Sequence, residues 1–361
     1  MLSRTFGLIR ESVFSAFIGL GPAADALAAA TRIPNVLQNL LGEGALSAAF
    51  IPVYSAELEK DEREAGRIAG AVAAILALIA AVTVVVGVIA ARPITQVLAW
   101  GFRDDERLDL AVSLVRITFP AAGILVLSAW CLGILNSHRR FFLAYVAPVL
   151  WNVAQITVVA MAALVFDVDD LDDLARAAAY GFLLGSLLQF LVQVPNVVRL
   201  APELRIRLDG RRAGVREVRR RFGGALLGRG VLQISGYIDT LLASLLVAGA
   251  VGALVKAQVL YLMPIALFAI SIAAAELPEL SRLTEHDQIR RRAQAGFGRI
   301  AFFISFIALA YVTLGDLIVG TLFERREFTS DDTLTVWLVL LAYAIGLPAS
   351  ALSRLTQNTL W

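Results

Sequence analysis

Five ionisable residues lie within apolar stretches near the N-terminus, where residues 2–53 otherwise have the composition of membrane helices. They are three arginines and two acids, namely Arg4, Arg10, Arg32, Asp25 and Glu43. A charge near the centre of a bilayer costs about 2.5–3.5 kcal/mol on insertion scales, so such residues usually face water or an opposite charge. We therefore expect a polar cavity inside a helix bundle, suited to a hydrophilic or anionic cargo.

The three arginines are candidate ligands for phosphate. A guanidinium group stays charged and presents a planar fork of donors that matches phosphate oxygens. Arg4 and Arg10 are six residues apart, about 120° apart around a helix but within two turns, so both can line one wide cavity. The alternative is that they snorkel to lipid headgroups, which is harder for Arg32 in the middle of its segment. Several arginines in one cavity would suit a diphosphate.

Asp25 and Glu43 are the acidic partners predicted for this substrate site. Each could neutralise an arginine or relay a coupling ion, and the structural role is favoured for both. Glu43 lies in the sequence GEG, where flanking glycines permit a helix break or a close helix approach.

Asp239 stands alone in the apolar sequence QISGYIDTLLASLL. An isolated buried carboxylate must be protonated, paired or bound to a cation. One interpretation is a Na⁺ or H⁺ site to which Gln233 and Ser235 add oxygen ligands. The other is a salt bridge to Arg229 or Lys256.

The remaining reactive residues exclude several classes of site. The single cysteine, Cys131, excludes an intramolecular disulfide and a thiolate cluster, and it is expected to be a small core residue. The two histidines, His138 and His286, are too far apart in the sequence to suggest a metal site or a triad. The carboxylate cluster DVDDLDD at 167–173 has no histidine nearby. An intramembrane phosphatase or glycosyltransferase would lack its catalytic cluster, and we expect no enzyme and no metal site.

The composition places the chain in a membrane. It is 58% hydrophobic and only 17% charged, with a mean hydropathy of +0.75, whereas soluble domains average about 25% charged residues. Apolar residues form runs long enough to span a bilayer. We predict an all-α polytopic protein with about ten spanning segments, at 3–20, 23–55, 68–91, 111–136, 142–166, 174–198, 224–249, 253–276, 297–322 and 333–357.

Loop charges predict the orientation. Basic residues concentrate in alternate loops, including nine arginines between 199 and 221, and the positive-inside rule puts these loops and the N-terminus in the cytoplasm. The 199–221 stretch lacks aromatic interleaving, so it suggests contact with anionic lipid headgroups rather than nucleic acid. We expect a multi-pass membrane protein with a cytoplasmic N-terminus.

The same stretch predicts the domain organisation. It separates a six-helix N-terminal lobe, 1–198, from an incomplete C-terminal lobe of about four helices, 223–361, with a basic cytoplasmic linker at 199–222. A weak internal repeat supports two lobes: prolines recur in RIPN and IPVYS of the second segment and in LMPI and LPELSR of the eighth.

Several strings resemble one known family. SRTFGLIRE and ADALAAATRIPNVLQNLLGEGALSAAFIPVYS are similar to the N-terminal signature of the MurJ (MviN) lipid II flippases, within the multidrug/oligosaccharidyl-lipid/polysaccharide exporter superfamily. Further matches follow in family order, namely RITFPAAGILVLSAWCLGILNSHRRF, APVLWNVAQI, LQISGYIDTLLAS and AAAELPELSR.

The resemblance implies two lobes around a central cationic cavity and alternating access. It implies transfer of the undecaprenyl-diphosphate-linked peptidoglycan precursor, lipid II, from the cytoplasmic to the outer leaflet, with membrane lipids and cell-wall synthesis proteins as further partners. It also implies substrate handling at Arg4 and Arg10 and, as in some members, a sodium site that includes Asp239.

Three departures leave alternatives open. Gln38 and Asn39 stand where the family often has basic residues, and Gln258 and Val259 stand where it often has an Asp-Arg pair; Lys256 nearby could substitute. The chain ends at Trp361 inside the tenth segment, whereas the family has about fourteen helices, so a C-terminally truncated chain is expected. The alternatives are a flippase for another polyprenyl-linked glycan or a degenerate cell-wall scaffold; a cationic-drug exporter should have an acidic or aromatic cavity instead.

Overall fold

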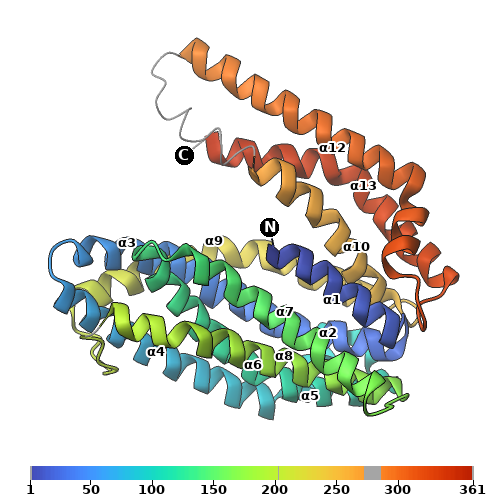
Figure 1. Ribbon diagram of the computed structural model, residues 1–361, viewed down its shortest axis with the longest axis horizontal. Coiled ribbons are helices and arrows are strands. Elements are labelled where there is room, and N and C mark those ends of the chain that lie inside the picture. Colours follow the sequence, from blue (N-terminus) through green and yellow to red (C-terminus); the bar gives the residue numbers. More distant parts are fainter. Residues whose placement is uncertain (1, 202, 272–285, 360–361) are drawn as a thin grey trace. The chain divides into compact units, whose positions relative to one another are not determined.

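The computed structural model describes residues 2–201, 203–271 and 286–359, without the side chains of 42–43, 227–232, 234–235, 269–270, 286–293 and 354–359. Helices make up the secondary structure of these residues, which include no strand (Figure 1). The all-α prediction is therefore confirmed. The string LPELSR and the side chains of Glu43, Arg229 and Ser235 lie outside what is described.

The chain divides into two compact units, 2–251 and 252–361. The first contains α1 (Leu2–Ile18), α2 (Pro22–Leu37), η1 (Gln38–Gly44), α3 (Ala45–Leu58), α4 (Glu62–Ile89), α5 (Ala91–Leu98), η2 (Trp100–Phe102), α6 (Arg107–Ser137), α7 (Phe141–Leu164), α8 (Leu171–Leu200) and α9 (Ala213–Ser244). The second contains nearly all of α10 (Ala250–Pro264), followed by η3 (Ile265–Ile270), α12 (His286–Phe323) and α13 (Ser330–Thr359).

Eight helices of the described residues are long and apolar enough to cross a membrane. They match eight of the ten predicted segments. The other two predicted spans, 3–20 and 224–249, coincide with the 17-residue helix α1 and with the second half of α9. The short helices α5 and η2 were not predicted.

The second predicted segment, 23–55, runs on through its two prolines. Pro34 and Pro52 lie inside α2 and α3, and the helix loosens into the π-helical turn η1 between them instead of ending. A second π-helical turn, η3, directly follows Pro264 in the predicted repeat partner. Since π-helical turns are rare and concentrate at functional sites, their recurrence favours the internal repeat.

The boundary between the units lies at Val251, downstream of the predicted linker at 199–222. The linker and α9 pack with the first six predicted segments, because α9 lies along α3 and linker residues lie against α4. The predicted lobes, 1–198 and 223–361, are groups of membrane helices, whereas the two units are defined by contacts between residues. The lobes therefore stay a prediction.

The acidic run DVDDLDD caps a helix. The Asp170 carboxylate accepts a hydrogen bond from the Asp173 amide at 2.9 Å, and Asp172 and Asp173 lie in the first turn of α8. Carboxylates at a helix N-terminus satisfy free amides and complement the helix dipole. This explains the charge cluster without a catalytic role.

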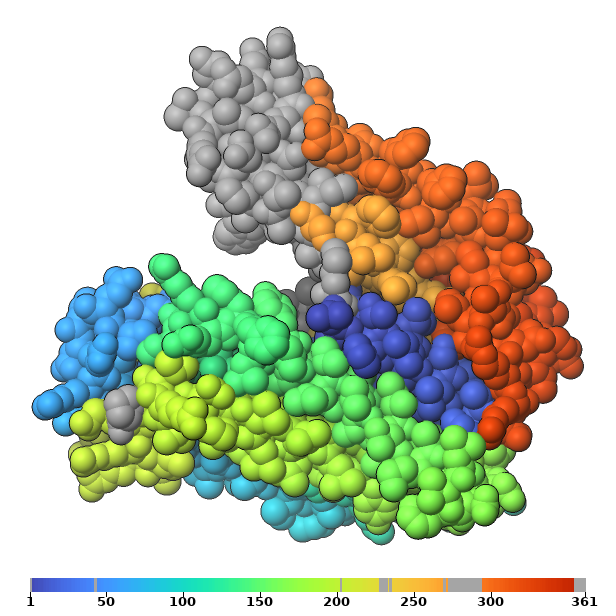
Figure 2. Space-filling model, viewed as in Figure 1, coloured from blue at the N-terminus to red at the C-terminus, as the bar shows by residue number. Residues whose placement is uncertain are grey.

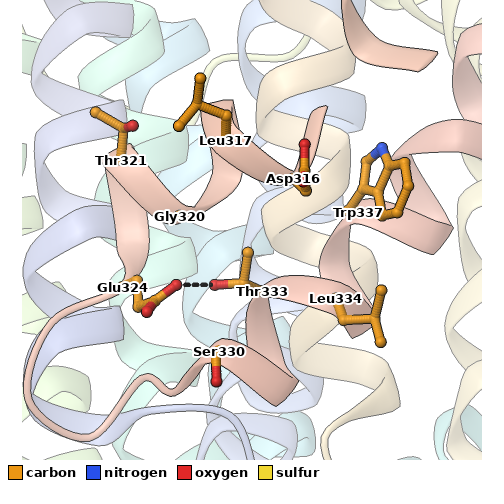
Figure 3. Close-up of a pocket in the computed structure, with 9 residues that line it drawn as sticks. All are labelled: Asp316, Leu317, Gly320, Thr321, Glu324, Ser330, Thr333, Leu334 and Trp337. Atoms are coloured by element: carbon orange, nitrogen blue, oxygen red, sulfur yellow. Dashed lines mark hydrogen bonds between the residues drawn. The ribbon is translucent and has the colours of Figure 1, made fainter. Parts of the chain in front are cut away.

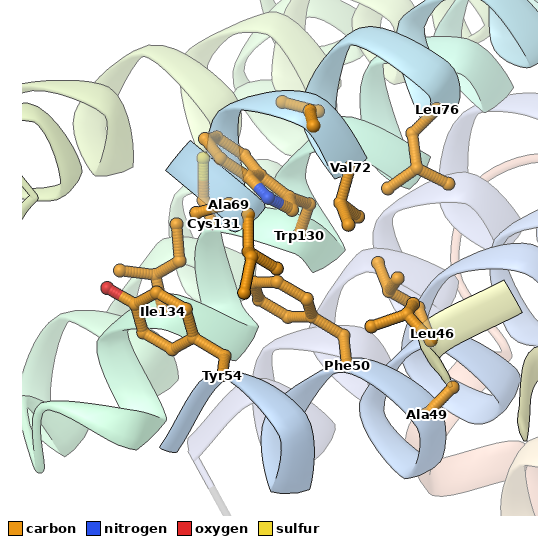
Figure 4. Close-up of a cluster of buried hydrophobic side chains, with 14 of the residues drawn as sticks. Leu46, Ala49, Phe50, Tyr54, Ala69, Val72, Leu76, Trp130, Cys131 and Ile134 are labelled. Atoms are coloured by element: carbon orange, nitrogen blue, oxygen red, sulfur yellow. The ribbon is translucent and has the colours of Figure 1, made fainter. Parts of the chain in front are cut away.

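The core of the first unit holds α3, α4 and α6 together (Figure 4). Phe50 and Tyr54 of α3 stack at 5.2 Å and, like Cys131 of α6, are almost completely buried. Truncating a buried phenylalanine costs about 3–5 kcal/mol. Because α6 also packs on α2 and α8, this core fixes the helix that carries Asp25 and Arg32.

Candidate functional site

Arg10 is anchored within α1 by partners on two helices. Its Nη2 donates to the Glu11 carboxylate at 2.6 Å, and its Nη1 donates to Asn152 Oδ1 of α7 at 3.2 Å. The guanidinium carbon lies 5.3 Å from the Trp151 ring and 5.8 Å from the Phe14 ring, within cation–π range. The group is thus fixed in place while its side chain keeps 17% of its surface exposed.

The Arg10 site contains a donor that is not used internally. Arg10 Nε is buried with no hydrogen-bond partner among the described residues. A buried donor without an acceptor costs about 1–3 kcal/mol. An incoming oxyanion that reached the guanidinium would remove this cost, so the arrangement suits an anionic ligand.

Arg4 lies on the exposed surface of α1. The first turn of this helix is tied to α7, since Asn152 Nδ2 donates to the Ser3 carbonyl at 3.5 Å and to the Pro148 carbonyl at 2.9 Å. In the space-filling view, α1 is the dark blue surface strip beside green α7 (Figure 2). Arg4 is therefore available to solvent or headgroups.

Arg32 faces α9. A Cβ atom added at Gly236 would lie 2.1 Å from Arg32 Nη2, so this glycine makes room for the guanidinium. The three predicted arginines therefore meet different surroundings: Arg10 contacts α7, Arg32 contacts α9 and Arg4 is exposed.

Asp25 is completely buried in an ion pair. Its Oδ2 accepts from Arg107 Nη1 of α6 at 3.0 Å and from the backbone amide of Gly249 at 2.8 Å. Gly249 has φ +93°, a left-handed conformation that disfavours other residues. Asp25 thus joins the start of α2, the start of α6 and the turn after α9, which supports the structural alternative.

A second carboxylate completes this cluster. Arg107 also donates from Nε and pairs through Nη2 with Asp105, both at 2.7 Å, and its guanidinium lies 4.4 Å from the Phe102 ring. Burial alone would raise the pKa of Asp105, but hydrogen bonds from the Arg107 amide and side chain outweigh it and lower that pKa. Arg107 thus lies between the carboxylates of Asp25 and Asp105.

Glu43 and Asp239 receive less structural support. The Glu43 backbone lies in η1, at the predicted break, but its side chain is outside the described set. Asp239 is half-buried on α9, as is Gln233. Among the residues searched, no group of three or more His, Cys, Asp or Glu could hold a metal ion. The ion site at Asp239 stays a prediction.

In the second unit, α10 carries both Lys256 and Gln258. Lys256 is 4% exposed, and its Nζ lies 5.9 Å from the Phe328 ring. Gln258 Nε2 donates to the Tyr343 hydroxyl at 3.0 Å, which joins α10 to α13. The amide at position 258 therefore serves packing between helices.

A pocket of about 570 Å³ lies between α12 and α13 (Figure 3). Two carboxylates, Asp316 and Glu324, line it, and the Thr333 hydroxyl donates to Glu324 at 2.9 Å. Its lining contains no arginine or lysine. This acidic pocket is unsuited to a diphosphate.

Three residues of the first unit were missed at the sequence level, namely Glu11, Asn152 and Arg107. An Arg-Glu dipeptide inside an apolar helix is a signal for the first. Asn152 interrupts the apolar string APVLWNVAQI, which is a signal for the second. Arg107 precedes the predicted segment 111–136, and its pairing with Asp25 across 82 residues has no local signal in the sequence.

Comparison with known proteins identifies the family. The family model described as "Lipid II flippase MurJ" matches residues 14–361. The chain belongs to this family. With the eight candidate spans, this makes it a multi-pass protein of the inner membrane.

Curated relatives agree with the family model. The chain is 33% identical to the probable lipid II flippase MurJ of Rhizobium meliloti, covering 98% of this chain and 66% of the relative. It is 33% identical to the lipid II flippase MurJ of Burkholderia cenocepacia, covering 96% and 68%. The chain thus spans about two thirds of the length of these relatives.

Solved structures share the fold. The lipid II flippase MurJ in an inward closed conformation matches with a TM-score of 0.84 and 25% identity, covering 99% of this chain and 73% of that one. An inward-facing multidrug MATE transporter matches with a TM-score of 0.72 at 16% identity, covering 99% and 82%. The second likeness shows the fold alone.

Proposed function

We propose that this chain moves lipid II from the cytoplasmic to the outer leaflet by alternating access and catalyses no covalent step. The observation that carries the proposal is Arg10, a guanidinium fixed inside an apolar helix by Glu11, Asn152 and Trp151. Membership in the lipid II flippase family supplies the substrate class.

In this proposal, Arg10 binds the diphosphate, and the exposed Arg4 and the α9-facing Arg32 add attraction. Phosphate oxygens would replace Asn152 and supply the acceptor that Arg10 Nε lacks. Glu11 would stay paired with Arg10, which would limit the affinity for the anion so that it can be released. Translocation also needs different affinities in the two states of the transporter.

The Asp25–Arg107 pair would hold the turn after α9 in one of those states. Asp25 joins α2, α6 and the Gly249 amide, so opening this end would break a buried ion pair and a hydrogen bond. Under the proposed orientation, with a cytoplasmic N-terminus, this end faces the outside. A Na⁺ or H⁺ bound at Asp239, or the membrane potential, would then bias the return step.

A second candidate is a flippase for another polyprenyl-linked glycan. Gln38 and Gln258 favour it, since both are neutral where the family often has charged residues, and Gln258 is engaged with Tyr343. The diphosphate would be the same and the headgroup different. Cell-wall synthesis proteins are the partners expected for either substrate.

Genetic complementation separates these candidates. A bacterium depleted of its own MurJ would express this chain, an Arg10→Ala variant or an Arg176→Ala control, which removes an exposed arginine paired with Asp173. We expect growth with the parent and the control but not with Arg10→Ala at equal membrane levels. No growth with a well-expressed parent would favour another glycan or a scaffold.

A further inference from the structure

A second cationic site lies apart from the Arg10 group, where the basic linker meets α4. A pocket of about 170 Å³ is lined by four arginines, one alanine and one acid, namely Arg67, Arg205, Arg207, Arg212, Ala71 and Asp209. Arg212 pairs with Glu64 at 2.6 Å and with Asp209 at 3.0 Å. These two carboxylates leave two guanidinium charges in excess, so the pocket attracts an anion.

Backbone packing shapes this pocket. A Cβ atom at Gly70 would lie 2.2 Å from the Arg205 carbonyl oxygen, and one at Gly66 would lie 3.1 Å from the Glu203 carbonyl carbon. The two glycines, one helical turn apart, therefore let the linker lie directly on α4. This close approach places Arg205 and Arg207 beside Arg67.

An apolar groove lies farther along the same two helices, α4 and α9. It has a volume of about 140 Å³ and is lined by Ile75 and Ile79 of α4 and by Val215 and Phe222 of α9, among others. Positions 67, 71, 75 and 79 are four residues apart, so they form one stripe about 18 Å long that winds by about 120° around α4. Arg67 lies at the start of this stripe, and the apolar side chains of Ile75 and Ile79 lie farther along it.

We propose that this pocket and groove bind an anionic phospholipid of the cytoplasmic leaflet, such as phosphatidylglycerol. Its phosphodiester would contact Arg205, Arg207 and Arg67, and one acyl chain would lie in the groove. Arginines suit phosphate because their donors form paired hydrogen bonds with its oxygens. The charge at one end and the apolar wall at the other match an amphiphile rather than a free anion.

The site is distinct from the proposed route of lipid II. It lies on α4, the linker and the first turns of α9, whereas Arg10 lies between α1 and α7. A lipid here would hold the linker against α4. Binding can be measured without flipping, so failure of this proposal would leave the proposed function standing.

Native mass spectrometry of the purified chain in detergent tests the site, with phosphatidylglycerol, phosphatidylethanolamine, inorganic phosphate and undecaprenyl diphosphate as separate probes. We expect preferential retention of phosphatidylglycerol and about tenfold weaker apparent affinity in Arg205→Gln/Arg207→Gln. The matched control is Arg139→Gln/Arg140→Gln, which removes two exposed arginines outside the pocket. Its affinity should be unchanged.

A substitution in the groove separates the contribution of the lipid headgroup to binding from that of the acyl chain. Ile79→Trp should weaken phosphatidylglycerol binding severalfold and leave phosphate binding unchanged, because Ile79 lines only the apolar part. Equal retention of phosphatidylethanolamine, loss of affinity in the control, or a preference for undecaprenyl diphosphate that disappears in Arg205→Gln/Arg207→Gln would each overturn the assignment. Phosphate binding as tight as lipid binding would also overturn it, since the tail would then contribute nothing.

Discussion

Buried charges of the first unit have two different surroundings. Asp25 is completely buried, and its carboxylate is satisfied by Arg107 and the Gly249 amide. Arg10 is paired as well, but its Nε has no acceptor among the described residues and its side chain is partly exposed. The first arrangement is that of a structural ion pair, whereas the second leaves binding capacity for a ligand.

The Asp25 pair gives a prediction about stability. Asp25→Asn should lower the free energy of unfolding by about 3–5 kcal/mol, because it leaves the buried Arg107 with less compensating charge. Thermal denaturation in detergent should show a fall in Tm of several degrees. The control is Asp109→Asn on α6, near Arg107, which breaks an exposed pair with Arg92 of α5. That change should cost less than about 1 kcal/mol, and equal losses would contradict the structural role of Asp25.

At the residue scale, the sequence predicts which charges need partners but not which partners they find. The apolar context of Arg10 and Asp25 signals that each must be compensated. Glu11 was within reach of that reasoning, because it adjoins Arg10. Arg107 and Gly249 were not, because 82 and 224 residues separate them from Asp25, and only the folded packing brings them together.

The linker and α4 show how an element is positioned by glycine. Gly70→Ala should displace the linker, since its Cβ would lie 2.2 Å from the Arg205 carbonyl oxygen. Trypsin should then cleave faster after Arg205 and Arg207. The control is Gly224→Ala in α9, where nothing lies within 4 Å of an added Cβ. This control should gain about 0.5–1 kcal/mol in stability, and unchanged cleavage in Gly70→Ala would contradict the docking.

The junction between α3 and α6 gives a pH prediction. His138 Nε2 lies 2.9 Å from the Tyr54 hydroxyl, and burial lowers the His138 pKa below 6.5; Arg140 adds to this shift and Glu62 opposes it. The unfolded chain therefore takes up this proton more readily, so stability is complete above pH 6.5 and falls as the pH drops below it. His138→Gln should flatten this part of a Tm-against-pH curve between pH 7 and 5. An identical slope in the variant would contradict the assignment.

At the element scale, hydrophobic runs predicted the spanning helices well, because run length and composition define a membrane helix. The π-helical turns η1 and η3 were not predicted. Proline and glycine signal an interruption, but packing decides whether the helix ends or only loosens. The docking of residues 203–205 on α4 was also missed, since Gly66 and Gly70 look like ordinary helix glycines in the sequence.

For the whole molecule, the proposed orientation can be tested with single cysteines. The buried native residue would be removed by Cys131→Ala, and Asp170→Cys or Arg140→Cys would then be introduced at exposed positions. A membrane-impermeant maleimide should label Asp170→Cys in spheroplasts and Arg140→Cys only after lysis. The reverse pattern would invert the orientation inferred from loop charges.

The most direct test of the central claim measures lipid II in the outer leaflet of cells that depend on this chain. An impermeant amine-reactive label would be applied to spheroplasts, and the labelled fraction of lipid II would be compared between the parent chain and Arg10→Ala at equal expression. We predict labelled lipid II with the parent and at least a tenfold smaller fraction with Arg10→Ala. Equal labelling in both would contradict the account, because Arg10 would then have no part in moving the substrate.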